Sequence, residues 1–212
     1  ETLRNAIRKS NNVSAAQTLM TMVGVDRSVD FLLRMGVDSD HIDATPYGLS
    51  LGSSGITPLQ LTVAYGVLAN AGVYQEPISF LGISDSDGNV VYDSHAQQER
   101  RQVFRPSTAW MTVDMMKGVI SNGTGSSAKI KGQTVAGKTG TNSDQRGVTF
   151  SGMTGWYASA IWVGHDNYRP LSSKSTGNGS AAPIWQSYMS KIHQAKNLSD
   201  RDIIEATPDQ LG

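Results

Sequence analysis

The spacing of hydrophobic residues along the chain changes from helix-like to strand-like, which predicts a domain that mixes both kinds of element. Residues 57–72 form the clearest helical pattern, because Thr57 can cap its start and Pro58 suits its first turn. Apolar residues lie on nearly every side of this predicted helix, so we expect it to be buried. Further helical patterns cover residues 2–33, with breaks near Gly24 and Gly36, and residues 107–120.

Shorter segments suit strands, and those from residue 134 onward predict an antiparallel sheet. These segments are residues 78–83, 90–92, 134–139, 155–159 and 160–163. Asp87 and Gly88 lie between the first two segments and are a strong hairpin signal. Residues 197–212 are polar and contain Pro208, so we expect them to form a surface tail behind a domain portion at residues 1–196.

Composition and charge exclude several classes of protein. The 18 basic and 18 acidic residues balance, so nothing indicates a nucleic-acid partner. The chain has no cysteine, which excludes thiol catalysis and disulfides, and its four histidines lack the spacing of a zinc site. No apolar run approaches the ~20 residues that span a bilayer. From the absent cysteines and the scattered histidines we expect neither a metal nor another cofactor.

Lys138, Thr139 and Gly140 form the most informative motif in the chain, and two chemistries fit it. The triplet K-T-G occurs in serine acyltransferases of the β-lactamase and penicillin-binding type. Residues 132–139 also match the P-loop pattern G-x-x-x-x-G-K-[ST], in which the lysine binds nucleotide phosphates. The first reading places Lys138 beside a catalytic serine and a carboxylate.

The surroundings of Lys138 favour the acyltransferase reading. A P-loop follows a buried strand and opens a helix, because its phosphates bind at the helix N-terminus. Residues 121–127 are instead a turn-forming cluster, and residues 140–147 contain two glycines and weak helix formers. A P-loop nucleotide hydrolase nevertheless remains as an alternative.

A second motif strengthens the acyltransferase reading. Residues Ser10, Asn11 and Asn12 fit the S-x-N element that accompanies K-T-G, and they lie upstream of it as that order requires. Helix-compatible residues 2–9 and 13–22 flank the motif, which suits a short loop that points polar side chains into a cleft.

Several further segments extend the likeness over residues 3–192. They are residues 48–53, 57–61, 64–65, 68–72, 123–125, 160–167 and 181–185. With these segments the chain resembles the transpeptidase domain of a class A penicillin-binding protein, a bifunctional enzyme that builds peptidoglycan. The resemblance implies an α+β fold: an antiparallel sheet flanked by helices with an all-helical lobe, incomplete in this chain. One departure is visible at residues 147–150, where the family usually has Asp-Ala-Trp-Phe.

The resemblance also implies the reaction, which is peptidoglycan cross-linking by serine acyl transfer. A serine attacks the carbonyl between two D-alanines of a stem peptide, and β-lactam antibiotics acylate the same serine. Ser10 and Lys138 are expected to complete the proton path of that serine. Asn12 is expected to offer its carboxamide to the amide backbone of the substrate.

The remaining site residues implied by the resemblance bind substrate. Thr139, Gly140 and Thr141 form the substrate-binding segment, and Lys138 makes the cleft positive where the terminal carboxylate of the substrate binds. The hydroxyls of both threonines can bind that carboxylate. The backbone N–H of Thr141 is expected to supply half of the oxyanion hole.

The nucleophile of this family, the serine of an S-x-x-K motif upstream of S-x-N, is absent from this chain. Only nine residues precede Ser10, and none is a serine. The one S-x-x-K, at residues 126–129, follows S-x-N and lies in a turn, and the G-x-S-x-G at residues 48–52 lacks the strand that a nucleophile elbow requires. We interpret both as coincidences.

The missing motif predicts that this chain is the C-terminal portion of a longer protein and is inactive alone. Its partner is then the upstream part bearing S-x-x-K, either within one polypeptide or as a separate chain. The resemblance implies that the full-length protein is also a glycosyltransferase. It further implies a place on the extracytoplasmic face of a bacterial cell membrane, anchored by a segment absent here. A non-catalytic peptidoglycan-binding relative, which kept the fold and lost the nucleophile, is the remaining alternative.

Overall fold

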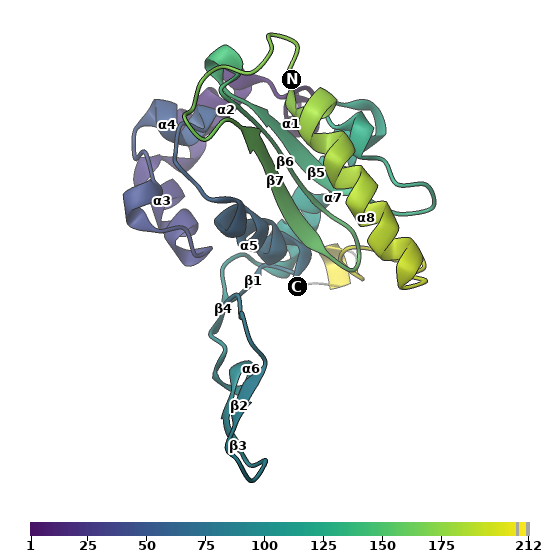
Figure 1. Ribbon diagram of the computed structural model, residues 1–212. Coiled ribbons are helices and arrows are strands. Elements are labelled where there is room, and N and C mark those ends of the chain that lie inside the picture. The colour runs from purple at the N-terminus through teal and green to yellow at the C-terminus, as the bar shows by residue number, and fades with distance from the viewer. Residues whose placement is uncertain (207, 211–212) are drawn as a thin grey trace.

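The computed structural model describes residues 1–206 and 208–210 and consists of a central antiparallel sheet with helices on both faces (Figure 1). The α-helices are α1 (Leu3–Lys9), α2 (Asn12–Thr18), α3 (Val25–Arg34), α4 (Pro46–Leu51), α5 (Pro58–Ala69), α6 (Ser94–Gln97), α7 (Pro106–Asn122) and α8 (Ala182–Ala195). The strands are β1 (Val73–Gln75), β2 (Gly82–Ser84), β3 (Val90–Asp93), β4 (Arg100–Gln102), β5 (Ala136–Thr141), β6 (Gly147–Met153) and β7 (Ala158–Gly164). Short π-helical turns cover Leu19–Val23 and Gly177–Ala181.

The central sheet has the order β5-β6-β7, and its strands are all antiparallel. The middle strand β6 is almost entirely buried, yet residues 147–153 were not predicted as a strand. Residues 155–159 and 160–163 were expected as two strands, but the structure has the single strand β7, preceded by a turn. Strand β5 begins and ends two residues later than residues 134–139 predicted. The predicted antiparallel arrangement is confirmed.

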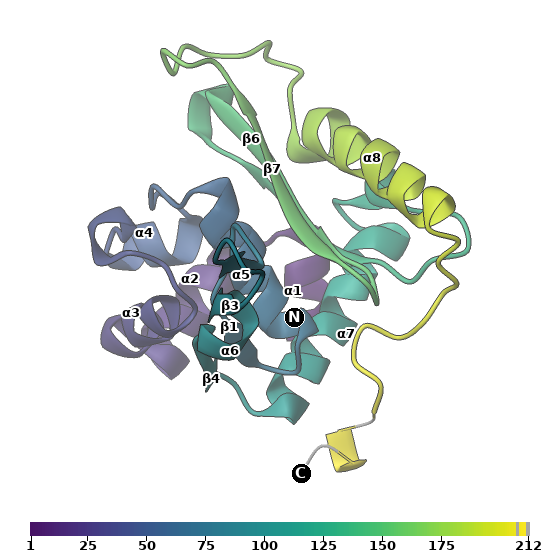
Figure 2. The same ribbon diagram turned by 60° about the horizontal axis from the view of Figure 1, so that its bottom comes forward.

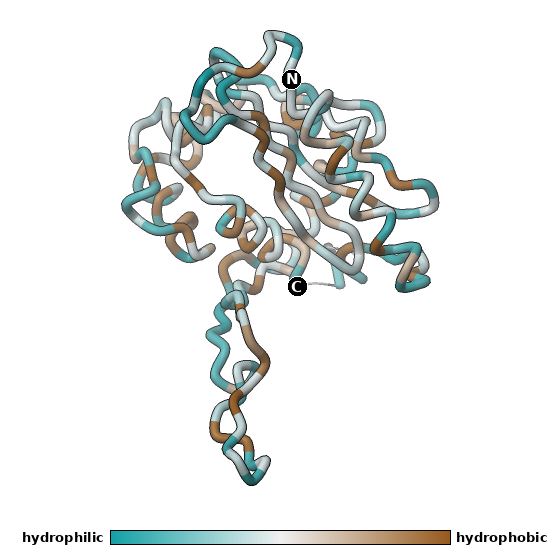
Figure 3. Tube along the Cα trace, viewed as in Figure 1, coloured by the Kyte–Doolittle hydropathy of each residue, from teal (hydrophilic) through white to brown (hydrophobic). Residues whose placement is uncertain are grey.

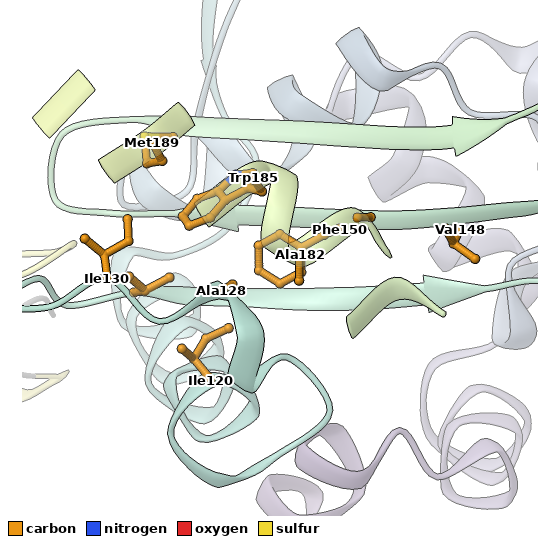
Figure 4. Close-up of a cluster of buried hydrophobic side chains, with 10 residues drawn as sticks. Ile120, Ala128, Ile130, Val148, Phe150, Ala182, Trp185 and Met189 are labelled. Atoms are coloured by element: carbon orange, nitrogen blue, oxygen red, sulfur yellow. The ribbon is translucent and has the colours of Figure 1, made fainter. Parts of the chain in front are cut away.

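Helix α8 covers one face of the sheet, and α5 and α7 cover the other (Figure 2). Trp185 on α8 contacts Phe150 on β6 edge to face, with ring centroids 5.1 Å apart, and Met189 lies one turn further along α8 (Figure 4). On the opposite face Met153 of β6 packs with Val113 of α7. Two hydrophobic layers therefore fix the sheet between the helices.

Helices α2, α3 and α4 lie together to one side of the sheet, where α5 borders them, and form the predicted helical lobe (Figure 1). Thr57 caps α5, as its position predicted, and the structure adds a capping box between Thr57 and Gln60. The expected burial of α5 is wrong in part, because only Gln60 and Val67 are buried and Leu59 is 59% exposed. Helix α5 contacts β7 and α7 along one side, and this packing leaves Leu59 uncovered. The α+β fold class is confirmed.

A long hairpin extends away from the sheet below α5 (Figure 1). Strands β1 and β4 form its base, and β2 and β3 form its outer end around the turn that contains Gly88, whose φ is 84°. The hairpin predicted from Asp87 and Gly88 is therefore confirmed. Hydrophobic residues lie exposed along the outer end of the hairpin (Figure 3), where Leu81 is 73% and Val90 is 69% exposed.

The residues after α8 pack against the sheet and do not form a free surface tail. Ile203 and Ile204 are buried in the hydrophobic cluster on the α7 face. Asp200 accepts a hydrogen bond of 2.6 Å from the backbone N–H of Thr134, and the carbonyl of Ser199 accepts one of 2.8 Å from the Nε1 of Trp156. The predicted tail was wrong here, because two adjacent isoleucines anchor a segment that is otherwise polar. Residues 207 and 211–212 of that predicted tail lie outside the described residues.

None of the helices in residues 1–206 and 208–210 has the length and apolar character that a bilayer crossing requires.

Candidate active site

Lys138 and Ser10 meet at the edge of the sheet. The Nζ of Lys138 donates a hydrogen bond of 2.8 Å to the Oγ of Ser10 and another of 3.0 Å to the backbone carbonyl of Thr139. Burial lowers the pKa of Lys138 below the usual lysine value, because an ammonium group loses hydration there. The S-x-N serine and the K-T-G lysine thus form one polar contact in a partly desolvated place.

Helix ends position the Ser10 hydroxyl. Ser10 ends α1 in the left-handed region, with φ 56° and ψ 52°, and its N–H bonds to the last turn of that helix. Asn11 then caps α2, since its side chain accepts a hydrogen bond of 3.0 Å from the N–H of Ser14. Asn12 lies in the first turn of α2 with an exposed side chain, and it makes no hydrogen bond to a side chain within the described ranges. The short connection between α1 and α2 places the Ser10 hydroxyl so that it faces Lys138 on β5.

Strand β5 is an edge strand, so one side of its backbone is open. The N–H of Asn142 donates to the carbonyl of Gly147 at 3.2 Å, so these two opposite residues form a hydrogen-bonded pair. Hydrogen-bonded pairs alternate with pairs that are not hydrogen-bonded along an antiparallel ladder, and the neighbouring residue Thr141 belongs to a pair of the second kind. The N–H of Thr141 therefore points to the free edge. The hydroxyl of Thr141 accepts a hydrogen bond of 3.0 Å from the N–H of Gly177.

Two glycines allow close packing at the end of β5. A Cβ on Gly140 would lie 2.2 Å from the Oγ1 of Thr149 on β6. A Cβ on Gly177 would lie 2.8 Å from the carbonyl of Gly140 and 2.9 Å from the Cβ of Thr139. A side chain at Gly177 would push the π-helical turn Gly177–Ala181 away from β5, and one at Gly140 would collide with Thr149 of β6.

The structure places Ser10 and Lys138 in hydrogen-bond contact. The other predicted residues of this segment, Thr139, Gly140 and Thr141, follow Lys138 along the same edge strand. Asn12 lies two residues beyond Ser10 and is not held to β5 by a hydrogen bond in the part of the chain described.

Two contact residues were missed. The hydroxyl of Thr139 donates a hydrogen bond of 3.0 Å to the Oγ1 of Thr124, and Gly177 binds Thr141 as described above. The G-T-G triplet at residues 123–125 is a signal that could have indicated Thr124. Nothing in the sequence around Gly177 indicates its contact, because it arises from the packing of a distant turn.

The competing motif readings do not match the structure. Lys138 lies in the middle of β5, which continues to Thr141 and is followed by a short 3-10 turn (Ser143–Gln145) and β6 rather than by an α-helix, so the P-loop interpretation of residues 132–139 is wrong. Ser50 lies inside α4 and donates a hydrogen bond of 2.6 Å to the carbonyl of Pro46, which excludes a strand-to-helix elbow. Ser126 lies in an exposed 3-10 turn after α7.

Comparisons with known proteins agree with this geometry. The family model described as the penicillin binding protein transpeptidase domain matches residues 1–184. Penicillin-binding protein 1A of Clostridium botulinum (strain Langeland) is 34% identical over 197 residues, which cover 90% of this chain and 23% of that protein. Penicillin-binding protein 1A of Aquifex aeolicus is 34% identical over 192 residues, covering 90% of this chain and 26% of that protein. The chain therefore spans about a quarter of the length of these relatives.

Solved structures show the same fold. A crystal structure of penicillin-binding protein 1A from Haemophilus influenzae has a TM-score of 0.81 at 22% identity, over 94% of this chain and 35% of that one. The PonA1 protein from Mycobacterium tuberculosis, solved in complex with penicillin V, has a TM-score of 0.81 at 20% identity, over 94% of this chain and 58% of that one. On the match to the family model and the identity to these relatives, the chain belongs to the penicillin-binding protein transpeptidase domain family.

Proposed function

We propose that this chain supplies the S-x-N and K-T-G segments of a serine D,D-transpeptidase that cross-links peptidoglycan and is acylated by β-lactams. The observation that carries the proposal is the hydrogen bond of 2.8 Å between the Nζ of Lys138 and the Oγ of Ser10. A lysine and a serine hydroxyl in a partly desolvated place can pass a proton between an attacking and a leaving group. PonA1, a protein of similar fold, was solved with penicillin V, which supports a β-lactam as a ligand.

The nucleophilic serine and its lysine lie, on this proposal, on an S-x-x-K segment outside the chain. Serine needs a neighbouring base to be activated, and residues 1–9, which precede the S-x-N segment here, contain no S-x-x-K motif that would supply this base. The chain also spans only about a quarter of the length of relatives such as penicillin-binding protein 1A of C. botulinum, which leaves room for that segment.

The reaction consists of two acyl transfers. The serine oxygen attacks the carbonyl carbon of the first D-alanine, and its proton passes through the network of lysines and Ser10 to the amine of the departing D-alanine. The C–N bond breaks and leaves an ester. The amine of a neighbouring stem peptide then attacks the ester, loses its proton to the same network and restores the serine. Lys138 holds the Ser10 hydroxyl in place for both proton transfers.

Strand β5 binds the donor peptide. The charge of Lys138 and the hydroxyls of Thr139 and Thr141 attract the terminal carboxylate, while Gly140 keeps the strand close to β6. The N–H of Thr141, on the free edge, supplies half of an oxyanion hole, and one such donor is worth about 3 kcal/mol of transition-state stabilisation. Asn12, exposed beside Ser10, offers its carboxamide to the peptide backbone.

The wider setting of the proposal concerns the full-length protein. We place it on the extracytoplasmic face of a bacterial membrane, held there by a segment outside this chain, with a glycosyltransferase elsewhere in the protein. The class A proteins that the chain resembles combine these two activities.

Release of D-alanine from a stem peptide ending in D-alanyl-D-alanine tests the proposal. The full-length protein should release D-alanine, and with an acceptor amine present it should form the cross-linked product. Lys138→Ala should slow both, whereas the exposed Lys131→Ala should slow neither. Binding of the peptide without release would instead identify a non-catalytic peptidoglycan-binding module.

A further inference from the structure

The loop formed by Gly123, Thr124 and Gly125 connects the two motif segments. The N–H of Thr124 donates a hydrogen bond of 3.2 Å to the carbonyl of Arg8, two residues before Ser10. The hydroxyl of Thr124 accepts the hydrogen bond of 3.0 Å from the Oγ1 of Thr139, the residue after Lys138. Thr124 therefore touches both the helix end that carries the serine and the strand that carries the lysine.

Close packing fixes the position of this loop. A Cβ on Gly123 would lie 2.6 Å from the carbonyl of Arg8 and 2.8 Å from the Cα of Val119. A Cβ on Gly125 would lie 3.1 Å from the Cγ1 of Val119, and the N–H of Gly125 donates to the carbonyl of Val119 at 3.0 Å. The backbone on either side of Thr124 has little room to move, so its hydroxyl stays within reach of Thr139.

The hydroxyls of Thr139 and Thr141 on β5 differ in whether their proton is free to be donated to a ligand. A hydroxyl has one proton to donate and two lone pairs to accept with. The hydroxyl of Thr141 accepts from the N–H of Gly177 and keeps its proton free. The proton of Thr139 instead points to Thr124. To donate to a carboxylate, the Thr139 hydroxyl must reverse this bond and accept from Thr124.

We propose that Thr124 is a positioning residue for carboxylate recognition, because its hydroxyl can accept from Thr139 in the free site and donate to it in the occupied one. The inference rests on the proposed function, since it takes the carboxylate of a stem peptide or a penicillin as the ligand of Thr139. In the occupied site a chain of donors runs from Thr124 through Thr139 to the anion. Each bond in such a chain polarises the next one, which strengthens the contact to a charged acceptor.

The test is the rate of acylation of the full-length protein by benzylpenicillin and by its methyl ester, which lacks the charged carboxylate. Thr124→Val keeps the shape of the side chain and removes the hydroxyl. It should slow acylation by the acid about three- to tenfold, the range expected for one hydrogen bond, and leave the ester rate close to wild type. Thr124→Ser retains a hydroxyl and should restore most of the acid rate. Ser126→Ala, an exposed hydroxyl two residues away, is the matched control and should change neither rate.

A double-mutant cycle separates positioning from a structural role. If Thr124 acts through Thr139, Thr124→Val should have no further effect on the acid rate in a Thr139→Val background. Equal losses for the acid and the ester, or a full effect of Thr124→Val in that background, would overturn the inference. So would an unchanged acid rate in Thr124→Val. A wild-type protein that neither penicillin nor the ester acylates would overturn the proposed function first, and the inference with it.

Discussion

The Nζ of Lys138 lies 2.8 Å from the Oγ of Ser10, although 128 positions separate the two residues in the sequence. The contact forms because the connection between α1 and α2 projects Ser10 toward the edge strand β5. Ser10 adopts a left-handed backbone with φ 56°, a conformation that is unfavourable for a residue with a Cβ. Strain and desolvation at one contact are typical of a site that the surrounding fold holds in place for chemistry.

Lys138→Ala in the full-length protein should slow acylation by penicillin about 100-fold or more, because a positioned proton-transfer group contributes a factor of this size. Lys138→Arg should restore only part of the rate, since a forked guanidinium cannot replace a compact ammonium beside Ser10. Stopped-flow acylation measures both variants, with circular dichroism to show that each is folded. Unchanged rates in both would mean that Lys138 is an ordinary strand lysine.

The lowered pKa of Lys138 makes a prediction about stability and pH. Between the folded-state pKa and the usual value of 10.5, the unfolded chain binds more protons at this residue, so the free energy of unfolding rises with pH. Lys138→Met removes the partly buried ammonium. It should therefore be more stable than wild type at about pH 7, and the difference should shrink as the pH approaches about 10.

Thermal unfolding of both proteins at the two pH values measures this difference, with the exposed Lys131→Met as the control. A stability gap between wild type and Lys138→Met that stays constant or widens with rising pH would contradict a desolvated Lys138.

Two substitutions at Ser10 separate its backbone strain from its hydroxyl. Ser10→Gly and Ser10→Ala both remove the hydroxyl, so both should slow acylation to a similar extent. Glycine tolerates the left-handed conformation, whereas alanine does not, and Ser10→Gly should be more stable by about 1 kcal/mol. Denaturant unfolding gives the difference, and equal stability of the two variants would show that the backbone at residue 10 relaxes.

The segment after α8 should contribute to the stability of the domain. Ile204→Ala removes a side chain that is 8% exposed and packs on the α7 face, so it should lower the free energy of unfolding by about 2–4 kcal/mol. Ile184→Ala, at a position 50% exposed on α8, is the matched control and should change stability by less than about 0.5 kcal/mol. Similar small effects at both positions would mean that residues 197–206 are a loosely attached tail.

Elements with strong local signals could be predicted from the sequence. Thr57 and Gln60 form the capping box of α5, and Gly88 supplies the positive φ of the hairpin turn. Both depend on interactions between residues a few positions apart. Strand β6 was missed because its glycines are poor strand formers. A Cβ on Gly152 would lie 2.6 Å from Phe150 and 2.9 Å from Trp185, so this glycine serves a packing arrangement that only the folded chain reveals.

Residues of the candidate site that belong to sequence motifs could be predicted, whereas contacts that arise from the packing of distant segments could not. The motifs and the family resemblance indicated Ser10 and Lys138 as members of one site, and the structure brings them together. The contacts of Thr124 with Thr139 and of Gly177 with Thr141 join segments far apart in the chain, through single hydrogen bonds that no local pattern encodes. The burial of Ile203 and Ile204 was missed for the same reason, because their polar neighbours dominate the local composition.

The location of the penicillin adduct tests the central claim most directly, since the claim is that this chain completes an acyltransferase whose nucleophile lies elsewhere. Incubation of the full-length protein with labelled penicillin, followed by intact mass and peptide mapping, should give one adduct on a serine of an S-x-x-K motif outside residues 1–212. Residues 1–212 alone should gain no mass. An adduct on Ser10, on Ser126 or on any other residue of this chain would contradict the account.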